Sequence, residues 1–406
     1  MSILDRTRFI VGFFACGILW ATPFGATIAI LLPQRFLVDS MGNATALVAQ
    51  LNSFGAVVSL VANIFWGTIS DRTRSRFGRR TPYIVIGSVF GGLFLYLTSV
   101  APNPALIILS WCCAQWFLNA LLAPFLAVLS DRVPDNNRAI MSSGYGLGNV
   151  LGQSLGQIVG AQLLGNLHFG ILLSGITLGV CGLIVVLIWP KEPSARDLPK
   201  PEQGLASVVR AFTPPTKNCR DFYLALFGRL MMISSMYMVV NYQLYILRQY
   251  MGLNQAQAAT ALSITASVIM VSSLIGSVIA GPVSDKLNRR KPLVIGSALL
   301  VAVGFMIPAL IPTTFSMYLW AVLYGFGNGV YGACDQALNV DVLPNKAEAG
   351  KDLGILNLSN SVGQVIGPVL TSFVVMAFGS YRLAFIFGSI ALVISCFIIA
   401  SIRKAK

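Results

Sequence analysis

Two ionisable side chains lie alone in long apolar stretches of this 406-residue chain. Arg229 is the only charged residue between positions 222 and 247, and Asp335 is the only one between positions 292 and 340. A carboxylate in an apolar setting can bind and release a proton, and a nearby arginine can hold its ionised form or contact a substrate. The alternative is a fixed ion pair that serves packing. We therefore treat Asp335 and Arg229 as candidate ion-coupling residues.

A stripe of aromatic and amide side chains leads up to Asp335. Tyr324, Asn328 and Tyr331 precede it at spacings that place all four residues on one face of a helix. Aromatic rings that stack, together with amides that hydrogen-bond, suit a neutral polyhydroxylated ligand, although such a stripe is more often ordinary packing. Other apolar stretches carry further candidate substrate contacts of the same kinds: Trp20, Phe24, Gln115, Asn119, Tyr237 and Asn241.

Motifs for enzymatic chemistry are missing from the sequence. His168 is the only histidine, which excludes a second histidine ligand for a metal, and no nucleotide-binding G-x-x-x-x-G-K-[ST] segment occurs. Residues 152–156 match G-x-S-x-G, but they lie in the middle of an expected helix with no strand before them. We expect no catalytic residues, no metal site and no cofactor, and hence a protein that is not an enzyme.

The composition predicts that most of the surface faces lipid. The chain is 56% hydrophobic and only 10% charged, whereas soluble domains carry about 25% charged residues. A helix needs about 20 apolar residues to cross a membrane. Uncharged runs predict an all-α polytopic membrane protein with twelve transmembrane helices: 9–34, 40–70, two within 81–130, two within 139–190, 222–247, 249–284, two within 292–340, 353–381 and 383–402.

The placement of Lys and Arg predicts the orientation. If both termini are cytoplasmic, 24 of the 28 Lys and Arg residues lie on the cytoplasmic side, and only Arg35, Arg248 and Arg382 lie outside. This asymmetry accounts for the net charge of +14 without nucleic acid as a partner. It indicates a multi-pass protein of the inner (plasma) membrane whose basic face attracts anionic membrane lipid.

A polar, proline-rich segment at 191–221 reads as a cytoplasmic linker, with a short surface helix near 205–212. It divides the chain into two six-helix bundles, 1–190 and 222–406. The two parts repeat one another. Residues 67–72 read GTISDR and residues 281–286 read GPVSDK, while residues 153–160 read QSLGQIVG and residues 360–367 read NSVGQVIG.

The repeated loop after the second and eighth helices resembles that of the major facilitator superfamily, and the resemblance covers the whole chain. The longer form at residues 70–82, SDRTRSRFGRRTP, is similar to the glycoside–pentoside–hexuronide symporters and the sucrose transporters. The resemblance implies two pseudo-symmetric bundles that rock around a midplane site lined by helices 1, 4, 7 and 10. It further implies secondary transport of a small polar solute, a sugar or glycoside, by a protein that we expect to be a monomer.

The resemblance assigns the charged loops to a cytoplasmic gate. An acid at such a loop can pair with arginine and with the N-terminus of a neighbouring helix; the competing interpretation is a topology signal alone. We expect Gly67 to allow close backbone approach, and Asp131 and Asp341 to join the network with Arg138 and with Lys346 or Lys351. The gating candidates are Gly67, Asp71, Arg72, Arg76, Gly78, Arg79, Arg80, Asp131, Arg138, Gly281, Asp285, Arg289, Arg290 and Asp341.

Two further expectations concern coupling and packing. The sodium site of melibiose-type symporters uses carboxylates on helix 2, and residues 40–70 contain none, so a coupled proton at Asp335, or uncoupled diffusion, is favoured over sodium. A drug or metabolite exporter that exchanges protons is the alternative function, although its Gly-Pro signature falls in helix 11 here instead of helix 5. Glycines spaced by four residues, 144 to 160 and 363 to 367, predict close helix packing.

Overall fold

The computed structural model describes residues 1–39, 41–196, 215, 219–287, 290–343 and 349–403. Within these ranges the side chains at 281, 285, 287, 336, 337, 340 and 349–351 are outside the description. The described residues form helices and connecting turns, without a strand. The chain divides into two compact units, Met1–Glu202 and Gln203–Lys406, hereafter the N-terminal and C-terminal units.

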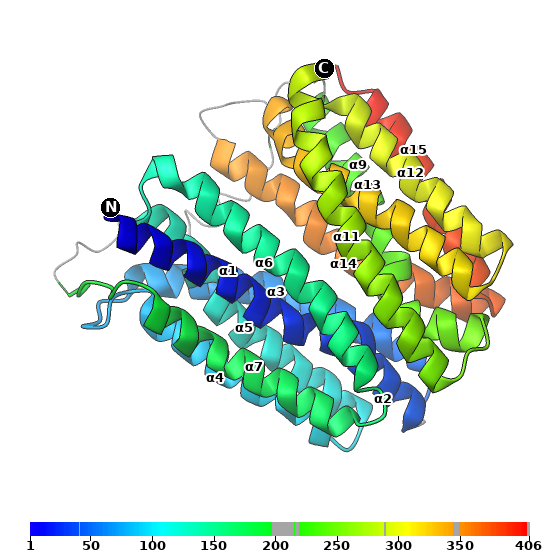
Figure 1. Cartoon of the computed structure of the whole chain (residues 1–406), viewed down its shortest axis with the longest axis horizontal. Coiled ribbons are helices and arrows are strands. Elements are labelled where there is room, and N and C mark those ends of the chain that lie inside the picture. The colour runs from blue at the N-terminus through cyan, green and yellow to red at the C-terminus, as the bar shows by residue number, and fades with distance from the viewer. Residues whose placement is uncertain (40, 197–214, 216–218, 288–289, 344–348, 404–406) are drawn as a thin grey trace. The chain divides into compact units, whose positions relative to one another are not determined.

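The helices of the N-terminal unit, coloured from blue to green in Figure 1, form six spans. The first span is interrupted by a π-helical turn, η1. The elements are α1 (Ile3–Ala26), η1 (Thr27–Leu31), α2 (Leu32–Val38), α3 (Ala44–Arg72), α4 (Thr81–Val100), α5 (Pro104–Arg132), α6 (Asp135–Gln162) and α7 (Leu167–Ile188).

The C-terminal unit repeats this order and has a second π-helical turn late in its own first span. The elements are α9 (Arg220–Val240), α10 (Gln243–Tyr245), η2 (Ile246–Tyr250), α11 (Gln255–Leu287), α12 (Lys291–Leu310), α13 (Thr314–Asp341), α14 (Ala349–Phe378) and α15 (Tyr381–Ala400). The expected surface helix near 205–212 lies outside the described residues.

Each of the twelve predicted spans has a helical counterpart in the described part of the chain. Ten of these helices are long and apolar enough to cross a membrane. The two helices that fall short of that measure are α6 and α13. Helix 7 differs from the prediction because it stops at Val240 and resumes at Gln243. There the N–H of Tyr242 bonds three residues back to the carbonyl of Val239 (3.0 Å).

Short polar residues determine where several helices begin. The side chains of Asn43, Asn103 and Asn166 accept hydrogen bonds from the backbone N–H groups of Ala46, Leu106 and Phe169. These bonds satisfy donors that the first turn of a helix leaves unpaired. Proline in the first turns of α4, α5 and α12 adds to the same effect. The breaks between the two spans predicted within 81–130 and the two predicted within 139–190 therefore have a local cause.

Helix pairs recur in the two units. In the N-terminal unit α1 packs on α6, α4 on α7 and α3 on α5, and in the C-terminal unit α9 packs on α14, α12 on α15 and α11 on α13. These are the same pairs when the spans are numbered within each unit. The predicted pair of pseudo-symmetric six-helix bundles is confirmed.

The glycine stripes lie at these helix contacts. A Cβ on Gly148 or Gly156 of α6 would lie 2.3 Å from the carbonyl oxygen of Phe14 or 2.1 Å from that of Thr22, both on α1. A Cβ on Gly367 of α14 would lie 2.4 Å from the carbonyl oxygen of Ser234 on α9. The packing prediction is confirmed, with the contacts made inside each unit.

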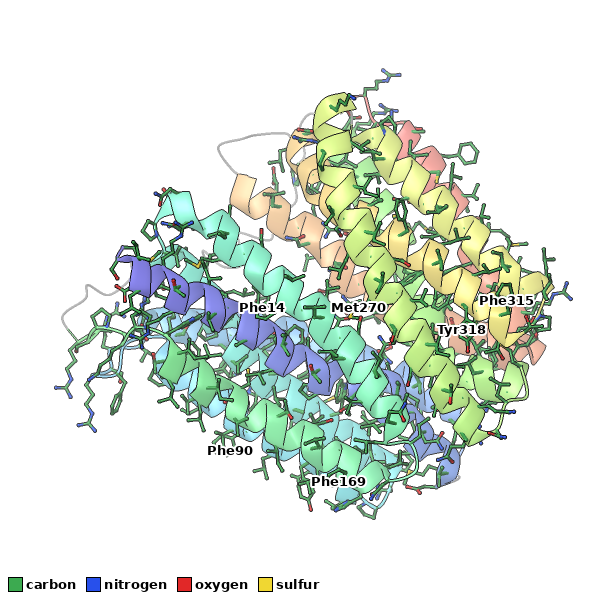
Figure 2. The ribbon with its side chains drawn as sticks, in the orientation of Figure 1. Phe14, Phe90, Phe169, Met270, Phe315 and Tyr318 are labelled. Carbon is green, nitrogen blue, oxygen red and sulfur yellow. The ribbon has the colours of Figure 1, made fainter. Side chains whose placement is uncertain are left out.

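The outer faces of both units are apolar. Phe90 and Phe169 in the N-terminal unit and Phe315 in the C-terminal unit are 42%, 49% and 67% exposed (Figure 2). Large exposed aromatic groups would be unfavourable in water but suit contact with hydrocarbon. The surface thus agrees with the composition.

Candidate functional site

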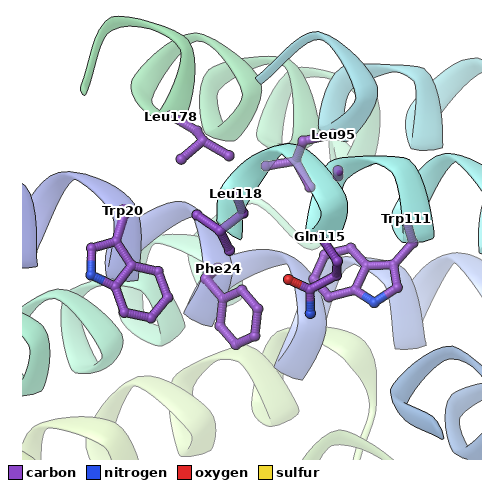
Figure 3. A pocket seen from close by; sticks show the side chains of 8 residues that line it. Trp20, Phe24, Leu95, Trp111, Gln115, Leu118 and Leu178 are labelled. Atoms are coloured by element: carbon purple, nitrogen blue, oxygen red, sulfur yellow. The ribbon is translucent and has the colours of Figure 1, made fainter. Parts of the chain in front are cut away.

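Three predicted substrate contacts come together in a pocket inside the N-terminal unit. Trp20 and Phe24 of α1 face Gln115 of α5 across a space lined by Leu95, Leu118 and Leu178, among others (Figure 3). The Trp20 and Phe24 ring centroids are 5.7 Å apart. The pocket encloses about 250 Å³ of empty space, but admits little more than one water-sized sphere. It offers aromatic surface and one amide, and it must widen before it can admit a sugar ring.

Trp111 also belongs to this pocket, although the sequence analysis did not single it out. It is 2% exposed and its ring centroid lies 5.6 Å from that of Phe24. Its indole N–H has no hydrogen-bond partner among the described residues. The sequence does contain a signal for Trp111, because this residue precedes Gln115 by four positions and therefore lies on the same face of the helix.

Asn119 lies one turn further along α5 and does not line the pocket. Its amide nitrogen donates to Ser59 Oγ at 2.8 Å, and its amide oxygen accepts from Asn63 Nδ2 at 3.3 Å. Both partners are on α3. The Asn119 amide therefore joins α5 to α3 in this structure.

The structure brings the two isolated charges together in the C-terminal unit. Arg229 Nε of α9 lies 3.3 Å from Asp335 Oδ2 of α13, and both side chains are only 7% exposed. Asn339 donates to the same carboxylate oxygen at 3.1 Å, and Arg229 Nη1 donates to Asn357 Oδ1 of α14 at 3.1 Å. The Arg229 Nε contact is an ion pair by distance and lacks hydrogen-bond geometry. The network links α9, α13 and α14.

The predicted stripe on α13 extends from this ion pair. Tyr331 is buried one helical turn from Asp335, and its hydroxyl has no hydrogen-bond partner among the described residues. Tyr324 stacks on Trp320 with the centroids 5.0 Å apart. Asn328 is half-buried between these two tyrosines along the helix.

The two candidate substrate contacts on helix 7, Tyr237 and Asn241, come after Arg229 along the chain. Tyr237 is half-buried beside Gly367 of α14. Asn241 is buried at the point where α9 ends. A broken membrane helix exposes backbone polar groups where it is interrupted, which is a common setting for a solute site.

Several predicted gating residues of the N-terminal unit form a partly buried network. Arg80 is buried and pairs with Asp71, with Asp131 (Nε–Oδ2 2.8 Å) and with the Ser70 hydroxyl (2.5 Å). Arg79 pairs with the other oxygen of Asp131 at 2.8 Å. The ends of α3, α4 and α5 are thus held together by two arginines and two carboxylates.

Arg138 takes no part in that network, contrary to the expected pairing with Asp131. It pairs with Asp135 at 2.5 Å and donates to the carbonyl oxygens of Leu129 and Val133. The end of α5 leaves backbone carbonyls unpaired, and Arg138 satisfies them.

Other predicted gating positions are more exposed. Arg72 and Arg76 are exposed, and the Arg76 guanidinium lies 4.6 Å from the Phe77 ring centroid. An added Cβ at Gly67 would have no atom of the N-terminal unit within 4 Å. The expected close backbone approach at Gly67 is therefore not made within this unit.

Glu192, just after α7, completes the loop and was missed by the sequence analysis. Its carboxylate accepts hydrogen bonds from the backbone N–H groups of Arg79 (3.0 Å), Arg80 (3.2 Å) and Thr81 (2.8 Å) and from the Thr81 hydroxyl (2.7 Å). This carboxylate caps the N-terminus of α4, where negative charge is favoured. Gly78, with φ +89°, leaves room for it, since a Cβ there would lie 2.1 Å from the Glu192 carboxyl carbon.

The corresponding loop of the C-terminal unit is described in part. Arg290 Nη1 donates to both oxygens of Asp341 at 3.0 Å, with side-chain exposures of 39% and 36%. Gly281 lies within α11. Arg289, Lys346 and the side chains of Asp285 and Lys351 lie outside the described residues. Among the described residues no cluster of three or more His, Cys, Asp or Glu could hold a metal.

Two helical bundles with buried charges and lipid-facing outer surfaces define a multi-pass membrane protein. A model of the Major Facilitator Superfamily matches residues 9–276 and 232–406. The chain belongs to this superfamily, and it is a transporter of that class.

Relatives and solved structures agree with this assignment. The chain is 25% identical to the MFS transporter asaE of Aspergillus flavus over 80% of its own length and 71% of that protein. It is 26% identical, over 32% of its length and 27% of that protein, to Escherichia coli YagG, whose name assigns it provisionally to glycoside/cation symport. The uncharacterized symporter YnaJ of Bacillus subtilis is 32% identical over 22% of this chain and 18% of its own.

Two solved structures have the same fold. A bacterial homologue of the human lysosomal transporter Spinster superimposes with a TM-score of 0.76 at 16% identity, over 98% of this chain and 97% of that one. The nucleoside transporter NupG superimposes with a TM-score of 0.77 at 14% identity, over the full length of both chains. At these identities the likeness concerns the fold alone.

Proposed function

We propose that the protein is a secondary active transporter that moves a small polar solute, a sugar or glycoside, by alternating access, with a proton coupled at Asp335. The buried contact between Asp335 and Arg229 is the observation that carries the proposal. Removing two charges from water is costly, so an ion pair inside a membrane helix bundle usually has a functional role.

The proposed coupling step involves the few side chains that surround the Asp335 carboxylate. Ionised Asp335 attracts Arg229, and Asn339 and Asn357 fix the two ends of the pair. Protonation removes that attraction and leaves Arg229 with Asn357 and a solute as partners. Proton binding and solute binding thereby change the same contact, which is the physical requirement for coupling. Residues 40–70 supply no carboxylate for a sodium ion.

The substrate class follows from the chemistry of the pocket walls. Trp20, Phe24 and Trp111 provide flat apolar surfaces, and Gln115 provides a donor and an acceptor. A sugar has apolar ring faces and hydroxyl edges that match both. The name of the relative YagG supports glycosides as the first compounds to test.

The remaining parts of the proposal concern the gate and the topology. The Asp71–Arg80–Asp131 network closes the cytoplasmic side while the site opens outward, and the bundles 1–190 and 222–406 rock about the linker 191–221. Both termini lie in the cytoplasm, the membrane is the plasma membrane, and the protein acts as a monomer. Support comes from the Lys and Arg asymmetry and from the internal repeat.

Solute-induced alkalinisation in proteoliposomes tests the proposal. The purified protein is reconstituted and given a panel of sugars and glycosides, and the external pH and solute accumulation are recorded. Wild type should alkalinise the medium with one class of solute. Asp335→Asn should lose alkalinisation and accumulation but retain solute exchange, whereas Asp135→Asn, at an 87% exposed carboxylate, should behave as wild type.

Three outcomes would contradict the proposal. Fully proton-driven uptake by Asp335→Asn would remove the coupling assignment. Accumulation restored in the double variant Arg229→Gln/Asp335→Asn would show that the pair serves packing alone. Efflux of cationic dyes, without uptake of any sugar, would instead favour the exporter.

A further inference from the structure

We propose that a second pocket, at the end of the N-terminal unit where α1 begins and α7 ends, binds a phosphate group. The pocket opens to solvent and contains about 850 Å³ of empty space. It shares no lining residue with the pocket around Trp20, so it is separate from the candidate transport site. Its cationic side chains are Arg8, Arg132 and Lys191.

The two arginines are held rigidly by backbone carbonyls. Arg8 donates from Nε to the carbonyl oxygen of Ile188 at 2.6 Å and from Nη2 to that of Trp189 at 2.9 Å. Arg132 donates from Nη2 to the carbonyl oxygen of Pro190 at 2.5 Å. Among the described residues, the hydrogen bonds of the two side chains use Nε and Nη2 of Arg8 and Nη2 of Arg132. Nη1 of each arginine is therefore available to a ligand at little entropic cost.

The balance of charge favours an anion. Lys191 is exposed and makes no ion pair with the described residues. Glu192 also lines the pocket, but its carboxylate already accepts hydrogen bonds from the first residues of α4. Three cations and one occupied carboxylate give the lining a formal charge of +2, and the Asp5 carboxylate, which also acts on Arg132, lowers the local charge to +1. This still outweighs the roughly −0.5 charge at the C-terminus of α7. An arginine guanidinium can form two parallel hydrogen bonds to two oxygens of a phosphate.

The apolar side of the pocket favours a phospholipid as the source of that phosphate. Leu187 is 79% exposed and Phe77 is 54% exposed, and both line the pocket together with Val186. A free phosphate would leave these groups in contact with water, whereas acyl chains would cover them. Basic pockets at the ends of membrane helices are suited to anionic headgroups.

Lipid bound here would also stabilise the gating loop. Thr81 and Glu192 line the pocket and hold the start of α4, which carries Arg80 into its network. The site would therefore link headgroup binding to the stability of the closed loop, independently of which solute is carried.

Native mass spectrometry of the delipidated full-length protein tests the site. Phosphatidylglycerol, phosphatidylcholine and inorganic phosphate are titrated separately, and phosphate is also tested as a competitor of phosphatidylglycerol. We expect one tight phosphatidylglycerol site, no comparable phosphatidylcholine site, and about a fivefold weaker dissociation constant for Lys191→Gln. Lys191 makes no side-chain hydrogen bond within the described residues, so this variant should fold normally. Arg6→Gln, an exposed position on α1 outside the pocket, is the control and should bind as wild type.

The arms of the experiment separate the sources of phosphate. Tight binding of inorganic phosphate that is weakened by Lys191→Gln, without a phosphatidylglycerol site, would support a phosphate pocket supplied from solution. Equal loss in Lys191→Gln and Arg6→Gln would mean diffuse attraction and would overturn the proposal. Equal binding of phosphatidylcholine and phosphatidylglycerol would overturn it as well.

Discussion

Buried charged residues in this protein are held by several partners each. Arg35, expected in an outer loop, is 9% exposed and bonds to Asp39 (3.2 Å), to the carbonyl oxygen of Ala101 (2.6 Å) and to that of Thr98. Arg80 has two carboxylates and a hydroxyl, and Arg229 has Asp335 and Asn357. A buried charge is costly unless it is paired and hydrogen-bonded, so each of these sites specifies one local arrangement.

Replacing Glu192 should destabilise the loop between α3 and α4. Glu192→Gln keeps the shape but puts an NH2 group against backbone N–H donors, which should lower the free energy of unfolding by about 1–3 kcal/mol. Thermal unfolding in detergent measures the change. Asp135→Asn removes an exposed surface partner of Arg138 and should be indistinguishable from wild type. Equal melting temperatures for Glu192→Gln and wild type would show that the cap contributes nothing.

For single side chains, the sequence predicts which residues are candidates for a function better than it predicts which residues they contact. Asp335 and Arg229 stand out because charges are rare in apolar spans, and an ion pair between them was one of the two interpretations. Glu192 could not be found, because its donors lie 111 to 113 positions away. Asp131 has several arginines within reach, and spacing alone cannot choose Arg79 and Arg80 over Arg138.

Close backbone contacts between two pairs of helices recur in the two units. α6 packs on α1 and α14 packs on α9 through glycines, with backbone atoms where a side chain would otherwise be. Without a hydrophobic driving force between helices in lipid, such contacts gain stability from van der Waals packing. Each pair therefore behaves as a rigid piece within its unit.

Glycine-to-alanine changes on α6 should have opposite effects on its two faces. Gly156→Ala would force α6 away from α1 and should lower the free energy of unfolding by about 1–3 kcal/mol. Gly146→Ala, where an added Cβ meets no atom within 4 Å, should be neutral or stabilise by up to about 1 kcal/mol. Thermal unfolding of the two purified variants gives the comparison. The same sign for both would contradict the assigned packing face.

Helix positions were largely predictable because they depend on local composition. Charge-free runs and the breaks at Asn103 and Asn166 predicted the spans closely, since capping acts within three residues. The break at Asn241 was not predicted. It depends on Tyr242, whose hydroxyl donates to the carbonyl oxygen of Pro368 on α14 at 3.0 Å. A contact between residues so far apart in the sequence cannot be predicted from the local pattern.

The two units share a fold but differ in their charged sites. The described ion pair inside the spans, Arg229–Asp335, belongs to the C-terminal unit, and the described aromatic pocket belongs to the N-terminal unit. The loop arginines differ as well, since the side chain of Arg80 is 4% exposed and that of Arg290 is 39% exposed. Under the proposed function, the C-terminal unit therefore carries the coupling residues, and the N-terminal unit carries the aromatic pocket and the more buried gate.

This difference predicts unequal effects for matched arginine variants. Arg80→Gln removes a buried cation shared by Asp71, which is half exposed, and Asp131, which keeps Arg79, and should cost about 1–3 kcal/mol. Arg290→Gln removes an exposed pair and should cost about 0–1 kcal/mol. Thermal unfolding and solute uptake of both variants measure the contrast. Equal losses would show that the two loops contribute alike.

Access to the pocket from both sides of the membrane is the most direct test of alternating access. A single cysteine replaces Gln115 in a background without the seven native cysteines, and a membrane-impermeant maleimide is applied to intact cells or to inverted vesicles. Cysteines at His168 and Thr7, both exposed, serve as outside and inside controls. We expect position 115 to react from both faces and the solute to shift the ratio of the two reactions, while each control reacts from one face. Reaction of position 115 from a single face under all conditions would contradict alternating access at this pocket.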